Sequence, residues 1–122
     1  MTLSRIFFGK RGEDEAAKYL ERRGYKVLTK NYRCRLGEID IVARDGDTIV
    51  FVEVKTRGGS DFGEGVESVD VRKQRRIIAV SEVYLSENDI HDMAVRYDVV
   101  SIGRKGDGLI VELIKDAFVD EG

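Results

Sequence analysis

Residues 37–57 read GEIDIVARDGDTIVFVEVKTR, and this stretch decides the fold that we expect. Two runs of alternating apolar and polar residues flank an Asp-Gly pair, which is the strongest short-range signal for a β-hairpin. Successive side chains of a strand point to opposite faces of the sheet. The first run is therefore expected to place Glu38 and Asp40 on one face, with Ile39 and Ile41 on the other.

The length of the turn decides whether the acids of the two strands meet. A two-residue loop, either Asp45-Gly46 or Gly46-Asp47, keeps Asp40, Glu53 and Lys55 on one face, whereas a three-residue loop turns Glu53 away. Opposed residues on one face lie about 4.5–5.5 Å apart at Cβ. Two carboxylates at that distance repel each other unless a cation lies between them or one takes a proton. The functional interpretation therefore requires an even loop.

Composition bounds the class of protein. With 122 residues, we expect one domain over residues 1–122, with its core at about 9–114. The single Cys34 excludes an internal disulfide and a cysteine metal cluster. No apolar run is long enough to span a bilayer, and the first residues lack the apolar core of a signal peptide. We therefore expect a cytoplasmic protein without a membrane partner.

Charge is unevenly distributed along the chain. The net charge of −2 argues against a nucleic-acid partner. However, residues 1–80 carry 17 Lys/Arg and 13 Asp/Glu, a net charge of +4, whereas residues 81–122 carry 4 and 10, a net charge of −6. The pattern is compatible with polyanion binding on one side of the molecule and equally with a polarity that has no function.

Outward from the hairpin, apolar periodicity predicts two helices and three further strands. Ser68 or Asp70 is expected to cap the second helix. The expected elements are a helix at about 10–23, strands at 25–28, 37–43 and 48–56, a glycine-rich loop at 58–65, a helix from about 69–71 to 86, and strands at 94–102 and 109–114. The order αβββαββ indicates an α/β fold with a central mixed sheet flanked by helices, since each helix has only one apolar stripe to bury.

Polar residues on both helices are candidates for a site. Glu13 lies on the apolar face of the first helix, where a carboxylate needs a partner such as a metal or Lys55, although the helix dipole also favours an acid in a first turn. The second helix opens with cations, which its dipole disfavours and phosphate binding would explain; a solvated helix end is the alternative. Gln74 is expected to point inward, with Lys73 as the competing candidate. The candidates for nucleic-acid contact are Arg57, Arg72, Lys73, Arg75 and Arg76.

The hairpin acids have the composition of a metal-dependent hydrolytic site. Asp40 and Glu53 can supply oxygen ligands to Mg²⁺ or Mn²⁺, with the carbonyl of Val54 as a further ligand. Lys55 can position water or offset charge that develops on phosphate, and Glu38 is an auxiliary acid. A solvated strand face with Glu–Lys ion pairs is the alternative for the same residues.

The ordered set of motifs over residues 9–99 resembles a known superfamily. The matching stretches are Gly9-x-x-Gly12-Glu13-x-x-Ala16, Asn31-Tyr32-Arg33, Gly37-Glu38-Ile39-Asp40, Phe51-Val52-Glu53-Val54-Lys55-Thr56-Arg57, Lys73-Gln74-Arg75-Arg76 and Arg96-Tyr97-Asp98-Val99. They resemble the PD-(D/E)xK nucleases of restriction-endonuclease-like fold, in particular Holliday junction resolvases. Most closely, the chain resembles the YraN family of small bacterial proteins, an uncharacterised family assigned to that fold. Ile39 replaces the proline of the motif, and Tyr97 replaces the usual Phe.

The resemblance implies a restriction-endonuclease-like, three-layer fold and residue roles within it. It implies metal binding by Asp40 and Glu53, a catalytic role for Lys55, and support from Glu13 and Gln74. The expected activity is metal-dependent cleavage of DNA, branched DNA in particular. The alternatives are a non-catalytic nucleic-acid-binding protein or adaptor, and an RNA substrate. The modest basic charge favours the non-catalytic alternative unless a homodimer joins two basic faces.

Overall fold

The computed structural model describes residues 3–56 and 69–120, with the side chains from residue 12 onward except 104 and 105. These residues form helices and strands in the predicted order αβββαββ. The elements are α1 (Leu3–Arg22), β1 (Lys26–Cys34), β2 (Gly37–Asp45), β3 (Thr48–Thr56), α2 (Val71–Glu87), β4 (Ala94–Lys105) and β5 (Gly108–Phe118). The loop expected at 58–65 lies outside the described residues.

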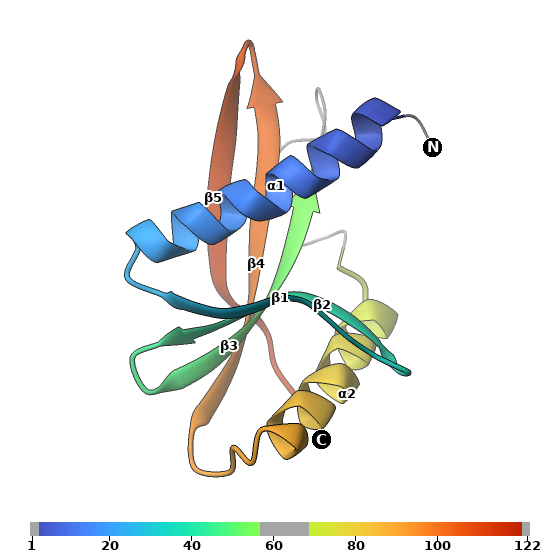
Figure 1. Cartoon of the computed structure of the whole chain (residues 1–122), viewed down its shortest axis with the longest axis vertical. Helices are drawn as coiled ribbons and strands as arrows, with labels where there is room; N and C mark the ends of the chain where they lie inside the picture. The colour runs from blue at the N-terminus through green and yellow to red at the C-terminus, as the bar shows by residue number, and fades with distance from the viewer. Residues whose placement is uncertain (1–2, 57–68, 121–122) are drawn as a thin grey trace.

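The strands form one mixed sheet in the order β1-β2-β3-β4-β5. β3 and β4 run parallel, and the other neighbouring pairs run antiparallel. Parallel neighbours need a long crossover connection, and α2 lies within it. Figure 1 shows α1 crossing one face of the sheet, with α2 against the other. The predicted three-layer α/β fold is therefore confirmed.

Each helix covers its own apolar core. The aromatic side chain of Phe51 faces α2, where its ring centroid lies 5.8 Å from that of Tyr84. The next residue, Val52, points to the opposite face and packs in the cluster with Leu20 of α1. The two faces of β3 are thus buried in two separate clusters, as period-2 alternation requires. Neither described helix is long and apolar enough to cross a membrane.

One predicted element boundary agrees with the structure, and two others differ from it. Asp70 is the N-cap of α2 and accepts a hydrogen bond from the Lys73 amide at 2.8 Å, as one of the two predicted caps. By contrast, α1 begins at Leu3, before the predicted position, and β1 continues to Cys34, well past the predicted end at 28. β1 is an edge strand with mostly polar, exposed residues, so hydropathy gave no signal for its second half.

The turn between β2 and β3 has the even length that the site requires. Asp45 pairs with Thr48, so the loop consists of Gly46 and Asp47. Gly46 has a φ of 58°, in the left-handed region that hairpin turns of two residues demand. Of the three registers open to the sequence, the structure adopts that of the Gly46-Asp47 loop, in which Ile41 pairs with Val52 and Asp40 and Glu53 come next on their strands.

β2 changes direction at Asp40, which the sequence did not predict. The pairing of β2 with β3 ends at Ile41 and Val52, while pairing with β1 continues to the tip of the β1–β2 hairpin. Ile41 packs in the cluster beneath α1, but Ile39 packs in the cluster beneath α2. The expectation that Ile39 and Ile41 share a face was therefore wrong. On the neighbouring strand, Asn31 lies between the partners of these two residues and has a φ of 56°, which departs from regular strand geometry.

Candidate functional site

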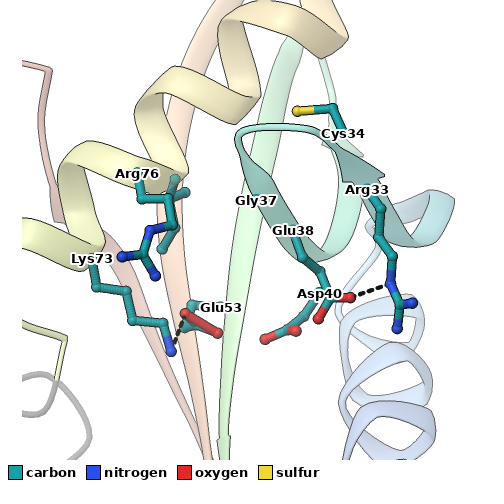
Figure 2. Close-up of a pocket in the computed structure, with 9 residues that line it drawn as sticks. Arg33, Cys34, Gly37, Glu38, Asp40, Glu53, Lys73 and Arg76 are labelled. Atoms are coloured by element: carbon teal, nitrogen blue, oxygen red, sulfur yellow. Dashed lines mark hydrogen bonds and ion pairs between the residues drawn. The ribbon is translucent and has the colours of Figure 1, made fainter.

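Two acids meet where β2 separates from β3. The side chain of Asp40 reaches across the gap, and its Oδ2 accepts a hydrogen bond from the Val54 amide at 2.8 Å. Glu53, one residue earlier on β3, is buried. Both acids line a cavity of about 440 Å³ between the β1–β2 hairpin and α2 (Figure 2). The other residues that line it are Arg33, Cys34, Gly37, Glu38, Lys73, Arg76 and Ile77.

The environment of Asp40 disfavours its charged form. Burial raises the pKa of Asp40 to about 8, and the hydrogen bond with Glu53 and the Glu53 charge act in the same direction. The Val54 amide lowers it, and the charge of Glu13 raises it further. The raised pKa of Asp40 favours a proton shared between Asp40 and Glu53, which would relieve the repulsion between two adjacent carboxylates.

Lys73 on α2 supplies the nearest cation. Its Nζ lies 3.0 Å from Oε2 of Glu53, and Figure 2 shows the side chain reaching from the helix to the acid. Burial lowers the pKa of Lys73, but contacts with Lys55 and Glu53 outweigh burial, so the pKa is raised on balance. Lys55 and Lys73 therefore lie together on the Glu53 side of the cavity, with Lys73 held as an ammonium.

Glu13 approaches the acid pair from the α1 side. Burial raises the pKa of the Glu13 carboxyl, and the charge of Glu38 raises it further. With its amide nitrogen turned toward the helix, Asn31 donates to both carboxylate oxygens of Glu13 at 3.0 Å. Glu38 itself pairs with Arg33, whose Nε lies 2.5 Å from its Oε2. Glu13 and Glu38 thus surround Asp40 with further negative charge.

The candidates Arg72, Gln74 and Arg75 do not line the cavity of the acid pair. Gln74 donates from Nε2 to the carbonyl of Val69 at 2.9 Å and lines a second cavity beside β5, together with Arg75. Arg72 is exposed and lines neither cavity. Arg57 lies outside the described residues. The structure thus brings Lys73 to the acids and leaves Gln74 on the other side of α2; the proposed roles of Gln74 and Arg57 stay predictions.

Helical spacing favours Lys73 over Gln74 as the residue of α2 that faces the acids. It lies four residues before Ile77 and seven before Val80, both of which are buried. Residues at these spacings share one helix face, so Lys73 continues the buried stripe toward the acid pair. Residue spacing does not predict that Gly37 and Arg33 line the cavity, because they reach it only through the change of direction of β2 at Asp40.

The donor set fits a hard divalent cation better than zinc. Among the residues that the structure describes, no group of three or more Asp, Glu, His or Cys side chains is arranged to hold a metal. Mg²⁺ and Mn²⁺ do not need one, since Mg²⁺ commonly uses one or two carboxylates and fills its remaining positions with water or substrate oxygens. Asp40 and Glu53 with the Val54 carbonyl would suffice, and a cation would relieve the repulsion that the shared proton now relieves.

The fold and the site define the chain as a three-layer α/β protein, in the order αβββαββ, with an acid pair where two central strands separate. The chain belongs to the family described as Uncharacterised protein family UPF0102, whose model matches residues 12–102. The predicted resemblance to the YraN family, which is this family, is thereby confirmed.

Bacterial relatives match almost the whole chain. A UPF0102 protein of Syntrophus aciditrophicus is 53% identical over 110 residues, which cover 90% of this chain and 87% of the relative. A UPF0102 protein of Syntrophotalea carbinolica is 43% identical over 122 residues, covering 100% of this chain and 99% of the relative. One from Geobacter metallireducens is 47% identical over 118 residues, covering 97% of both. Membership assigns no activity, so function has to be argued from the site.

Proposed function

We propose that this protein is a metal-dependent endonuclease that hydrolyses phosphodiester bonds of DNA. The observation that carries the proposal is the pairing of half-buried Asp40 with buried Glu53 at the separation of β2 and β3, with Lys55 and Lys73 beside them. Buried acids that repel each other reduce stability, and such local conflicts concentrate at functional sites. Branched DNA is the expected form of the substrate, from the resemblance to Holliday junction resolvases.

The residues would divide the chemistry between them. Asp40, Glu53 and the Val54 carbonyl would hold Mg²⁺ or Mn²⁺. The ion would polarise the phosphate and lower the pKa of an attacking water. Lys55 would orient that water or offset negative charge that develops on the phosphate. Glu13 would support Asp40 through the electrostatic coupling between them, and Glu38 would hold Arg33 at the rim.

A cleavage panel tests this proposal. Linear duplex, flapped and four-way DNA and single-stranded RNA would be incubated with Mg²⁺ or Mn²⁺. We expect cleavage of at least one DNA, and a loss of on the order of 10²–10³-fold in Lys55→Ala. Lys18→Ala is the matched control, because Lys18 is exposed on α1. Failure to cleave any substrate, with nucleic-acid binding indifferent to metal, would refute the proposal.

A non-catalytic nucleic-acid-binding protein or adaptor is the second candidate. The ion pair between Lys73 and Glu53 favours it, since this contact neutralises Glu53 without a metal. In that case Lys73 and the shared proton would be permanent structural partners of the acids. The panel separates the two candidates: the second expects binding without cleavage, and binding that Lys55→Ala leaves unchanged.

A further inference from the structure

The basic residues at the start of α2 divide between two sides of the helix. Lys73 and Arg76 line the cavity of the acid pair, whereas Gln74 and Arg75 line the cavity beside β5. Residues three apart share a helix face, and neighbouring residues do not. Arg75 and Arg76 therefore have the same chemistry and adjacent positions, yet of the two only Arg76 lines the cavity of Asp40.

Arg76 is held by its aliphatic stem against the β1–β2 turn. A Cβ added at Gly37 would lie 3.1 Å from both Cγ and Cδ of Arg76 and 3.3 Å from a methyl carbon of Val80. Gly37 also has a φ of 149°, which disfavours other residues. Glycine at this position thus allows the turn to approach α2 closely and lets the stem of Arg76 lie across it.

Among the described residues, the guanidinium of Arg76 has no hydrogen-bond or ion-pair partner. Within residues 12–56 and 69–120, it forms no hydrogen bond or ion pair, whereas Arg33 pairs with Glu38 and Lys73 pairs with Glu53. Figure 2 shows Arg76 descending from α2 on the same side as Lys73, with Arg33 across the cavity. The head group therefore points into a cavity with acids at its base and keeps its donors available for a ligand.

We infer that Arg76 binds one phosphate of a nucleic-acid backbone beside the acid pair, and that Gly37 is the positioning residue that makes this possible. A guanidinium matches the two free oxygens of a phosphodiester with paired hydrogen bonds. Arg76 would also offset part of the repulsion between the phosphate and the acids of the cavity, together with Lys73, which pairs with Glu53. The inference deepens the proposed function and rests on it for the identity of the ligand.

Binding of a short fluorescently labelled DNA, measured by anisotropy in EDTA over a range of salt concentrations, tests the inference. We expect Arg76→Ala to weaken binding by about tenfold and to reduce the salt slope by about one. Arg75→Ala, the matched control, should stay within about twofold of the wild type, because Arg75 faces the other cavity. Equal losses in both variants would overturn the inference, since they would indicate general attraction to a basic helix.

Two more variants address positioning. Gly37→Ala should lose affinity as Arg76→Ala does while circular dichroism reports a folded protein; unchanged affinity would overturn the role of Gly37. Arg76→Lys keeps the charge but not the paired geometry, so an intermediate affinity with an unaltered salt slope is expected. If Gly37→Ala does not fold, the Arg75 and Arg76 comparison decides. Cleavage is measured separately, so the two proposals can fail independently. If the protein cleaves nothing but Arg76→Ala binds DNA more weakly than Arg75→Ala, the nuclease proposal fails and the inference on Arg76 is supported. If the protein cleaves DNA but the two variants bind it equally well, the nuclease proposal is supported and the inference on Arg76 fails.

Discussion

Two carboxyl groups on opposite faces of the same sheet, buried Asp98 and half-buried Asp40, have opposite environments. Asp98, on the α1 side, is 0% exposed and fully compensated within the chain. It accepts hydrogen bonds from Arg96 at 2.9 and 3.0 Å, from the Tyr25 hydroxyl at 3.0 Å and from the Asp116 amide at 2.9 Å. Asp40, on the α2 side, has one backbone donor, and its nearest side-chain partner is another acid.

The difference separates a carboxyl group whose partners all come from the chain from one whose partners within the chain are incomplete. A buried charge with a full set of donors and a guanidinium is a closed network that needs nothing from outside the chain. Two adjacent acids are an open arrangement, which only a proton, an ammonium or a metal can complete. The same protein contains both, so the repulsion around Asp40 is not a general property of its buried acids.

The largest effect is expected from opening the closed network. Asp98→Ala should lower the free energy of unfolding by about 3–5 kcal/mol, because it leaves Arg96 half-buried without its main partner. Urea denaturation followed by circular dichroism measures this. A loss below about 1 kcal/mol would mean that Asp98 is not a structural anchor and would remove the contrast with Asp40.

A change of opposite sign is expected at the acid pair. Because the native pKa of Asp40 lies above its ordinary value of 3.8, the native state holds more protons than the unfolded state at pH values between the two. This contribution to stability is complete below pH 4 and is lost as the pH rises through about 8. Without metal, Asp40→Asn should remove that loss and be more stable than the wild type at pH 8, by on the order of 1–2 kcal/mol.

Unfolding of both proteins from pH 5 to pH 9 provides the measurement. Asp47→Asn is the matched control, since Asp47 is exposed in the turn at the other end of the same hairpin. If Asp40→Asn were the less stable protein throughout, Asp40 would be an ordinary ionised carboxylate and the account of the pair would fail.

A smaller effect is expected from removing the ammonium at Glu53. Lys73 Nζ lies 3.0 Å from Glu53 and repels a second cation there. Lys73→Ala should therefore raise the affinity for Mn²⁺ by on the order of fivefold, while Arg75→Ala leaves it unchanged. Calorimetric titration measures both. A lower affinity in Lys73→Ala would instead indicate that Lys73 holds Glu53 in the geometry needed to bind the ion.

The smallest effect is expected at the rim. The side chains of Arg33 and Glu38 are 75% and 40% exposed, so their ion pair should contribute about 0.2–1 kcal/mol to stability and less at high salt. A double-mutant cycle with Arg33→Ala and Glu38→Ala measures the coupling. A coupling above about 2 kcal/mol would show that this pair belongs to a closed network like that of Asp98.

The sequence predicted the fold where signals are local. The Asp-Gly turn and the alternation around it predict the β2–β3 hairpin, and the observed Gly46-Asp47 loop is one of the two even loops that the sequence allows. The break at Asp40 was not predictable from alternation, because that argument assumes an unbroken strand. The break is visible in the positive φ of Asn31 on the neighbouring strand and in the packing of Ile39 beneath α2. Both are properties of the assembled sheet.

The site was predicted by residue type more readily than by contact. The hairpin pattern predicts that Asp40 and Glu53 lie close together. The choice between Lys73 and Gln74 depends on how α2 is rotated about its axis, because consecutive helix residues differ by about 100° in direction. The partnership of Tyr25 with Asp98 joins residues 73 apart in the chain. No periodicity reports such a contact, so the closed network became apparent only in the structure.

The most direct test of the central claim, that Asp40 and Glu53 form a cation site, is titration of Mn²⁺ into wild-type protein by calorimetry at pH 7 in buffers of different ionisation enthalpy. We expect one binding event that releases a proton, because the ion would displace the proton held by the pair, and we expect Asp40→Asn to abolish it while Asp47→Asn does not. Absence of binding to the wild type, or equal binding to Asp40→Asn, would contradict the claim.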